Sequence, residues 1–405
     1  MLPRRWALAA AFACIAVMLS PVQSPVAHGQ TYTVLHSFNG ADGKWPYGTP
    51  SLSGSTLYGM TDGEYGTSNY GTIFSIDTDG SGFHSFLSFN RANGAYPQGS
   101  LTLSGSTLYG MTCQGGTSNY GTIFSINTDG SGFQNLFSFN RANGAYPTGS
   151  LTLSGSTLYG MTNQGGSNDH GAVFSINTDG SGFRNLLLFD GINGSRPFGD
   201  LTLSASTMYG MTDFGGTNGY GNVFSINTDG SGFKNLFSFN DANGSGPLGS
   251  LTLSGSTLYG MTWRGGSSNL GTVFSINTDG SEFHSLLSFN RANGAYPFLG
   301  SLTLSGSTLY GMTHNGGSSN AGTVFSINTD GTGYQRLFSF DNANGSLPYG
   351  SLTLSGSTLY GVASDGGRYS DGVIFSLTIP EPSTLVLLGI GALGLMGWAW
   401  RRRRA

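Results

Sequence analysis

A unit of about 50 residues repeats seven times along this chain, and the repeat limits the fold more than any other feature. Its marker is a Leu-Tyr-Gly or Met-Tyr-Gly tripeptide, whose tyrosines are Tyr58, Tyr109, Tyr159, Tyr209, Tyr259, Tyr310 and Tyr360. The marker therefore returns every 50 or 51 residues. Units of this length cannot each bury a core alone, so they are expected to fold by packing against one another.

Each unit contains four short stretches of β-forming residues separated by turn sequences. In the unit at 101–150 these stretches cover 101–103, 107–112, 121–127 and 133–139. The turn before the fourth stretch, Thr-Asp-Gly-Ser-Gly, supplies residues that accept positive φ angles. Alternate strand residues face opposite ways, so Phe124 and Ile126 share one face and Ile123 takes the other. Apolar side chains on both faces predict small sheets, each packed between two neighbours.

The copies of each stretch predict how the array closes. The third and fourth stretches both occur seven times, but the first copy of the fourth, at 34–38, precedes any complete unit. The last unit stops after its third stretch, at 375–377. We therefore predict an all-β fold, a seven-bladed β-propeller of four-stranded blades in which the N-terminal strand completes the last blade. The alternative, an open β-solenoid, would expose two apolar ends, and no polar capping repeat is visible.

Both ends of the chain are typical of targeting segments. Arg4 and Arg5 precede an apolar run over 6–19 and a small-residue site at 27–29, which predicts a signal peptide over residues 1–29. At the other end, an apolar segment over 385–400 predicts a transmembrane helix. It is flanked by Pro380, Glu381 and Pro382 before it and by Arg401, Arg402, Arg403 and Arg404 after it. The predicted propeller covers 30–379 and the predicted tail covers 380–405, for which an ordinary membrane anchor is the alternative.

This three-part tail resembles the PEP-CTERM sorting signal of Gram-negative bacteria. The resemblance implies processing by an exosortase-type membrane protease, an inner-membrane-anchored intermediate, and delivery to the cell surface or extracellular matrix. The repeat in turn resembles the bacterial GloVer tandem repeat over nearly all of residues 31–378. The matching residues are Leu108-Tyr109-Gly110, Gly115-Gly116, Gly121 to Phe124, and Phe139, Asn143-Gly144 and Pro147. That resemblance implies an exported repeat protein and no defined activity.

Charge and cysteine content limit the binding partners and the disulfide bonds that this chain can have. Of the 16 Lys and Arg and the 20 Asp and Glu, six basic residues and one acidic residue lie in the terminal segments. Residues 30–379 therefore hold 10 basic and 19 acidic side chains, a net charge of −9. Nucleic acid is not expected as a partner, because phosphate neutralisation needs clustered Lys and Arg. Cys113 is the one cysteine of this part, so it has no partner for an intramolecular disulfide.

The longer loops differ between repeats, whereas the short turns barely vary. Propeller geometry places the loops after the second strand and the loops between repeats on one face of the ring. Variation concentrated on a rigid scaffold is typical of a binding surface, although unconstrained drift of exposed loops would look the same. We predict a ligand-binding surface, with polysaccharide as the candidate ligand. Its residues are Trp45, Tyr47, Asn163, Gln164, Trp263, Arg264, Tyr296, His314 and Asn315.

Motifs for catalysis and for metal binding are weak in this sequence. The histidines lack zinc spacing, no nucleophile elbow is found, and the Asp-Gly turns lack the Glu of a calcium loop. Asp62, Glu64, Asp213 and Asp365 could face one another across the ring, but we expect them to be exposed with ordinary pKa values. The preferred hypothesis is a non-catalytic binding or adhesion scaffold without a cofactor. A glycan-active enzyme and a purely structural matrix component are the alternatives.

Overall fold

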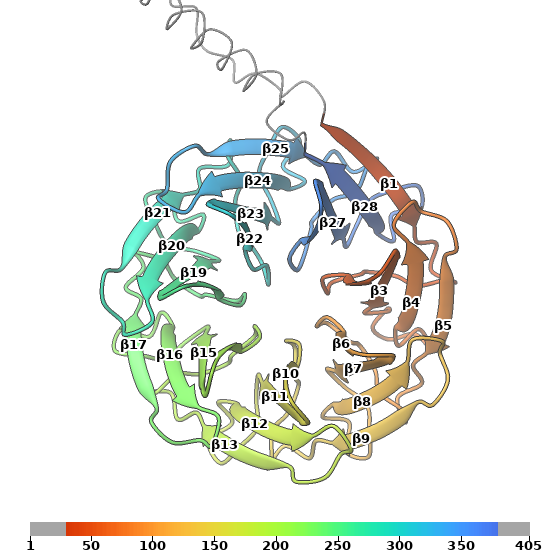
Figure 1. Ribbon diagram of the computed structural model, residues 1–405, viewed down its shortest axis with the longest axis horizontal. Helices are drawn as coiled ribbons and strands as arrows, with labels where there is room; N and C mark the ends of the chain where they lie inside the picture. Colours follow the sequence, from red (N-terminus) through yellow and green to blue (C-terminus); the bar gives the residue numbers. More distant parts are fainter. Residues whose placement is uncertain (1–29, 380–405) are drawn as a thin grey trace, which may run out of the picture.

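The computed structural model describes residues 30–379, which form seven four-stranded antiparallel sheets arranged in a ring (Figure 1). Every element in this range is a strand. Blade 1 consists of β2 to β5, each later blade takes the next four strands, and blade 7 combines β26, β27 and β28 with β1. The predicted seven-bladed propeller is therefore confirmed.

Each blade has one short strand near the axis and a longer strand beside it. The innermost strands are β2 (Ser51–Ser53), β6 (Thr102–Ser104), β10 (Thr152–Ser154), β14 (Thr202–Ser204), β18 (Thr252–Ser254), β22 (Thr303–Ser305) and β26 (Thr353–Ser355). The second strands are β3 (Thr56–Thr61), β7 (Thr107–Thr112), β11 (Thr157–Thr162), β15 (Thr207–Thr212), β19 (Thr257–Thr262), β23 (Thr308–Thr313) and β27 (Thr358–Ala363).

Two further strands complete each blade toward the rim. The third strands are β4 (Thr72–Asp77), β8 (Thr122–Asn127), β12 (Ala172–Asn177), β16 (Asn222–Asn227), β20 (Thr272–Asn277), β24 (Thr323–Asn328) and β28 (Val373–Thr378). The outermost strands are β1 (Thr31–Ser37), β5 (His84–Ser88), β9 (Gln134–Ser138), β13 (Arg184–Leu188), β17 (Lys234–Ser238), β21 (His284–Ser288) and β25 (Gln335–Ser339).

The N-terminal strand closes the ring as the repeat count predicted. β1 pairs antiparallel with β28, with Thr31 opposite Thr378 and Val34 opposite Phe375. Figure 1 shows β1, drawn in red, beside β28, drawn in blue, where the two ends of the ring meet. Because β28 would otherwise have an unpaired edge, this pairing removes a site for association with another chain.

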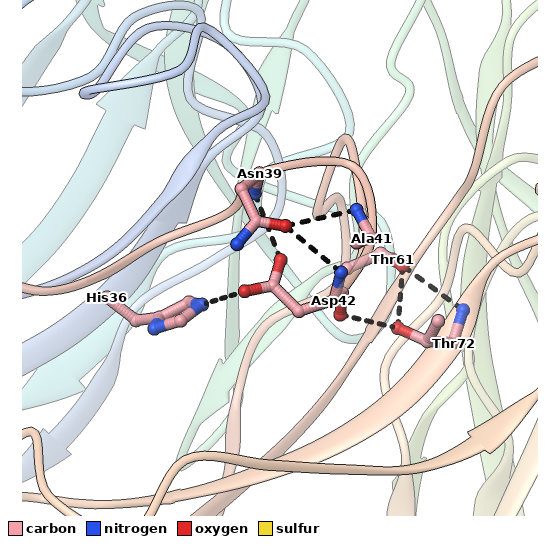
Figure 2. Close-up of polar contacts among 6 residues, drawn as sticks. All are labelled: His36, Asn39, Ala41, Asp42, Thr61 and Thr72. Atoms are coloured by element: carbon pink, nitrogen blue, oxygen red, sulfur yellow. Dashed lines mark hydrogen bonds and ion pairs between the residues drawn. The ribbon is translucent and has the colours of Figure 1, made fainter.

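Side chains tie the same strand to blade 1 (Figure 2). His36 Nε2 lies 3.0 Å from Asp42 Oδ2 in the first inter-blade loop, and Asp42 Oδ1 accepts the Asn39 N–H at 3.0 Å. Thr72 Oγ1 donates to the Asp42 carbonyl at 3.5 Å and lies 2.9 Å from Thr61 Oγ1. The closing strand is thus connected, through one loop, to the second and third strands of the neighbouring blade.

The hydrophobic core lies between blades rather than within any one of them. Met60 of blade 1, for example, packs in one cluster with Leu108 and Phe124 of blade 2. Equivalent clusters occupy the other six interfaces. The glycine of the marker tripeptide makes room for the large ring, because a Cβ on Gly110 would lie 2.4 Å from Phe124 Cζ. Apolar residues on both faces of each sheet are explained by these interfaces.

A closed circle of seven hydrogen bonds surrounds the axis. In each, a backbone N–H beside an innermost strand donates to the side chain at the same position of the next blade. The bonds are Thr49 to Ser100 at 2.8 Å, Ser100 to Ser150 at 2.8 Å, Ser150 to Asp200 at 2.5 Å, Asp200 to Ser250 at 2.7 Å, and Ser250 to Ser301, Ser301 to Ser351 and Ser351 to Thr49 at 2.8 Å each. The ring is therefore joined at its inner edge as well as at its rim.

A second circle of hydrogen bonds lies next to the first. A Ser or Thr hydroxyl of each blade donates to a backbone carbonyl of the next, as Thr102 does to Leu151 at 2.6 Å and Thr353 does to Pro50 at 2.5 Å. The equivalent bonds occur in the other five blades. Neutral hydrogen bonds of this kind contribute about 1 kcal/mol each, so the two circles add materially to a protein with no intramolecular disulfide in this range.

The two faces of the ring differ in their loops. The variable face carries the loops between second and third strands and the loops between blades, and the tail face carries the short turns. β1 starts at Thr31 and β28 ends at Thr378 on the tail face, so residues 30 and 379 both leave from there. The predicted signal peptide and the predicted tail helix lie outside the described residues. Between residues 30 and 379, no helix has the length and apolarity needed to cross a membrane.

Candidate functional site

Three residue positions recur in every blade of the variable face. The strand-end position directly follows the second strand and holds Asp62, Cys113, Asn163, Asp213, Trp263, His314 and Ser364. The pre-proline position of the inter-blade loop holds Trp45, Tyr96, Tyr146, Arg196, Gly246, Tyr296 and Leu347. The post-proline position holds Tyr47, Gln98, Thr148, Phe198, Leu248, Phe298 and Tyr349. In each blade, the strand-end N–H donates to the pre-proline carbonyl, from 2.9 Å at Asp62 to 3.3 Å at Ser364. The backbone is thus constant while the side chains change.

The pre-proline position has an unfavourable backbone conformation in every blade. Gly246 has φ +61°, and the six other residues have φ between +52° and +57°, including Trp45 at +56° and Tyr296 at +53°. Bulky L-residues rarely adopt such angles, and each one costs on the order of 1–3 kcal/mol. Blade 5 shows that glycine satisfies the same loop. The other six loops keep a large side chain despite this cost. The side chain of Tyr96 is buried, and the other five are at least partly exposed.

Aromatic side chains of four consecutive blades form a contiguous aromatic arc on this face: Trp263, Phe298, Tyr349 and Tyr47. Their ring centroids are 5.8 Å apart from Trp263 to Phe298, 5.2 Å from Phe298 to Tyr349, and 4.4 Å from Tyr349 to Tyr47. All four rings are half-buried, so each keeps part of its surface accessible. The arc passes from blade 5 to blade 1 beside the axis.

The structure brings several of the predicted ligand-binding residues to this arc. Tyr296 lies 6.2 Å from Trp263, the Arg264 guanidinium lies 4.0 Å above the Trp263 ring, and His314 meets the Tyr349 ring edge-on at 4.8 Å. Asn315 accepts a hydrogen bond from His314 Nδ1 at 2.7 Å. Five predicted residues, together with Tyr47, therefore belong to one surface.

The remaining predicted residues lie elsewhere on the variable face. Asn163 and Gln164 belong to blade 3, which blades 2 and 4 separate from the arc. Trp45 belongs to the loop into blade 1, where Lys44 Nζ lies 4.7 Å from its ring. Sequence reasoning had not selected Phe298 and Tyr349, the two rings that make the arc continuous. Their shared post-proline position is the signal that would have found them.

The loop carboxylates differ from the sequence prediction. Asp62 exposes none of its surface and Asp213 exposes 8%, because the strand-end side chain turns inward beneath the loop instead of pointing to solvent. Burial raises the pKa of Asp62 well above its ordinary value, and it raises the pKa of Asp213 to about 6 although Arg196 and Arg264 oppose that rise. The expectation of exposed groups with ordinary pKa values is therefore wrong for both.

The four carboxylates do not gather at one point of the face. Asp213 belongs to blade 4, whereas Asp62 and Asp365 belong to the adjacent blades 1 and 7. Glu64 Oε1 accepts a hydrogen bond from Lys44 Nζ at 3.2 Å, and Asp371 Oδ1 lies 3.3 Å from the same Lys44 atom. Burial also raises the pKa of Asp365, partly offset by Lys44. Asp62 and Asp365 both lie near Tyr47 and Tyr349, because each opposes the ionisation of those two hydroxyl groups.

Unpartnered buried polar atoms concentrate at the strand-end position. Both carboxyl oxygens of Asp62, Asn163 Nδ2 and His314 Nε2 are buried without a hydrogen bond. Burial lowers the pKa of His314, so its ring is neutral and Nε2 is an acceptor when Nδ1 donates to Asn315. Buried polar groups without partners cost free energy, and such groups in a native protein commonly face water, ions or ligands.

Metal binding and axial binding have little support in this geometry. Among the residues that the structure describes, no three His, Cys, Asp or Glu side chains are grouped as metal ligands would be. Cys113 is buried, and burial raises the pKa of its thiol. The axial cavity, which the Gly-Ser segments and Phe198 line, has a volume of about 30 Å³. That volume holds one or two water molecules but not a sugar ring, so a larger ligand would bind away from the axis.

Comparison with solved structures shows the propeller fold. An oligogalacturonate lyase in complex with manganese is 12% identical with a TM-score of 0.55, and the match covers 86% of this chain and 93% of that one. The GH74 enzyme of Niastella koreensis is 16% identical with a TM-score of 0.55, covering 85% of this chain and 53% of the enzyme. At these identities the likeness extends to the fold alone. None of the curated proteins matches this sequence.

Comparison with sequence families identifies both parts of the chain. A profile described as the Gloeobacter/Verrucomicrobia repeat matches residues 25–224 and 189–375, and the PEP-CTERM protein-sorting motif matches residues 378–404. Both resemblances expected from the sequence are confirmed. The sorting motif implies export, processing by an exosortase and a membrane-anchored intermediate in a Gram-negative bacterium. The chain belongs to the Gloeobacter/Verrucomicrobia repeat family and carries a PEP-CTERM sorting motif at its C-terminus.

Proposed function

We propose that this protein is a non-catalytic scaffold of the cell surface or extracellular matrix, and that its aromatic arc binds polysaccharide. The observation that carries the proposal is the continuous row of partly exposed rings from Trp263 to Tyr47. Sugars present apolar C–H faces that stack on such rings and hydroxyl groups that pair with neighbouring polar atoms. Ligand sites generally combine these two kinds of group.

The position of the chain ends supports this role. Residue 379 leaves from the tail face, so a protein held by its C-terminal segment presents the variable face, and the arc with it, away from the membrane. Six exposed aspartates line the turns of the tail face: Asp79, Asp129, Asp179, Asp229, Asp279 and Asp330. Hydrogen bonds from Ser or Thr lower the pKa of each, so the face toward the membrane is negatively charged and repels anionic lipid.

Binding to immobilised polysaccharides tests the proposal. Trp263→Ala removes the terminal ring of the arc, and we expect it to weaken binding about tenfold, since one aromatic stacking contact is worth roughly 1 kcal/mol or more. Tyr146→Ala is the matched control, because Tyr146 belongs to the loop between blades 2 and 3 and lies outside the arc. Equal loss of binding in both variants, or unchanged binding in Trp263→Ala, would contradict the proposal. Loss of melting temperature without loss of binding would favour loop packing as the role of these rings.

A glycan-active enzyme is the second candidate, and the Asp62 and Asp365 pair favours it. Burial favours the protonated form of Asp62, as a general acid requires, while Asp365 is partly exposed on the neighbouring blade. The polysaccharide that binds should be incubated with the protein and assayed for new chain ends. Release that Asp62→Asn abolishes would establish catalysis. A purely structural component would neither bind nor cleave.

A further inference from the structure

The strongest unexplained feature of the variable face is the environment of Asp62. Its carboxyl group is fully buried, and neither oxygen accepts a hydrogen bond of ordinary geometry. Gln98 is near enough to favour the charged form of Asp62, but its Nε2 donates to Tyr65 Oη at 3.4 Å. A buried carboxyl group with no firm partner therefore lies beneath the loops of blade 1.

Two tyrosines lie near this carboxyl group. Asp62 lies close enough to Tyr47 and Tyr65 to oppose the ionisation of both hydroxyl groups. Tyr65 stacks on Tyr96 with centroids 3.9 Å apart, and Tyr47 is the last ring of the aromatic arc. Aromatic rings beside a carboxyl group are a combination that favours an ammonium group, through cation–π attraction and an ion pair.

Asp62 also lacks the cation that accompanies other carboxylates of this face. Arg196 and Arg264 stabilise the ionised form of Asp213, the strand-end residue of blade 4. Lys44 forms ion pairs with Glu64 and Asp371, and Arg141 forms one with Asp169 at 2.8 Å. No Lys, Arg or His within the described range favours the charged form of Asp62. A ligand with its own positive charge would stabilise the ionised form of Asp62, which no protein cation stabilises here.

We propose that Asp62, Tyr47 and Tyr65 form a receptor for the ammonium group of an amino sugar, so that the arc recognises a polysaccharide with unacetylated amino groups. The inference rests on the proposed function, since the arc has to bind the rest of the polymer. Asp62 exposes no surface, so the half-exposed Tyr65 ring, at 48%, has to rotate to admit the ammonium and then lies against it. The Asp62 carboxyl gives its proton to solvent, and the resulting carboxylate pairs with the ligand's ammonium, which keeps its own protons.

The test compares two oligosaccharides of equal length on the full-length protein at pH 6. One is an oligomer of glucosamine, and the other is the same oligomer with every amino group acetylated and therefore neutral. We expect the charged oligomer to bind about 10- to 100-fold more tightly, the range for a hydrogen-bonded charge pair. Titration calorimetry in buffers of different ionisation enthalpy should report release of a proton on binding.

Variants at one structural position provide the controls. Asp62→Asn should abolish both the preference and the proton release, and Asp62→Ser should do the same. Asn and Ser are native to this position in blades 3 and 7, so both variants are expected to fold, which melting curves verify. Asp213→Asn, the matched change in blade 4, should leave both readouts intact.

The possible failures are distinguishable. Equal affinity for the two oligomers, or a preference that survives Asp62→Asn, would overturn the ammonium receptor while leaving polysaccharide binding in place. Asp62-dependent binding of polylysine without binding of either oligomer would also overturn it, in favour of a protein partner. If no polysaccharide binds at all, the proposed function itself fails, and the amino-sugar receptor fails with it.

Discussion

Tyr32 stacks on Phe338 with ring centroids 3.9 Å apart and planes 2° from parallel. Tyr32 belongs to the N-terminal strand in blade 7 and Phe338 to β25 in blade 6, so the closing strand also seals an inter-blade interface. Its hydroxyl donates to the Asn344 carbonyl at 2.5 Å. The strand is therefore held by its side chains as well as by its pairing with β28.

Replacing this ring should weaken the whole propeller. We expect Tyr32→Ala to lower the free energy of unfolding by about 2–4 kcal/mol, from lost apolar burial and ring stacking. Val34→Ala, on the same strand but more exposed, should cost less than about 0.5 kcal/mol. Urea unfolding of the two variants, fitted with the same m-value, measures both losses of unfolding free energy. Similar losses for the two variants would show that the strand contributes only its backbone.

We expect His36 to make the stability of the propeller dependent on pH. Burial lowers the pKa of His36, although Asp42 acts in the opposite direction. Since the folded state binds the proton less readily than the unfolded chain, His36 reduces stability as the pH falls below its ordinary value of 6.5 and through its folded pKa. His36→Phe, which places the residue found at the matching position of blade 2 (Phe137), should remove this contribution. The measurement is the difference in unfolding free energy between variant and wild type, followed from pH 7 to pH 5. A difference that stays constant would contradict the assignment.

Asp213 should show the opposite dependence on pH. Its pKa is raised to about 6, so the folded state holds a proton that the unfolded chain releases near pH 4. Relative to Asp213→Asn, the wild type should lose stability as the pH rises from 4 to 6, by at most about 3 kcal/mol, and change little above that range. The carboxyl carbon shift of Asp213 in NMR spectra would report the pKa directly. Titration near pH 4 would disprove the raised pKa.

Close approach at the axis predicts an unusually intolerant glycine. A Cβ on Gly249 would lie 1.9 Å from the Gly300 carbonyl oxygen, so Gly249→Ala requires two blades to separate. We expect a loss of more than about 3 kcal/mol, or failure to form the ring. Gly255→Ala is the control, because Gly255 has φ +57° but open space around it, and should cost about 1 kcal/mol. Ala205 already occupies the equivalent position with φ +52°. Thermal melting of both variants would decide, and equal losses would refute the steric explanation.

The blade number and the closing strand could be predicted because both depend on counting. Seven copies of each stretch, with one fourth strand displaced to the N-terminus, leave few arrangements that pair every edge. Strand limits also followed from turn residues, as at 107–112, which is β7 in the structure. The circle of hydrogen bonds around Ser100 could not be predicted, since its partners lie about 50 residues apart and meet only through the shape of the ring.

The site was harder to predict than the fold. The burial of Asp62 depends on the inward turn of the strand-end side chain, and the polar loop sequence around it is typical of an exposed residue. The aromatic arc depends on distances between loops of different blades, so the post-proline position that Phe298 and Tyr349 share did not by itself show that their rings meet. Trp263 and His314 were found because their large side chains stand out at the strand-end position, and Tyr296 because it is one of the aromatic residues of the inter-blade loops.

The left-handed pre-proline position has a consequence for how such a protein can diversify. Six different loops use the same backbone angles with Trp, Tyr, Arg or Leu, and a seventh uses Gly. Because the local strain is already present, exchanging one partly exposed side chain at this position for another adds no new backbone strain while altering the exposed surface. Related proteins can therefore acquire new recognition properties by single substitutions in loops of a ring whose core stays the same.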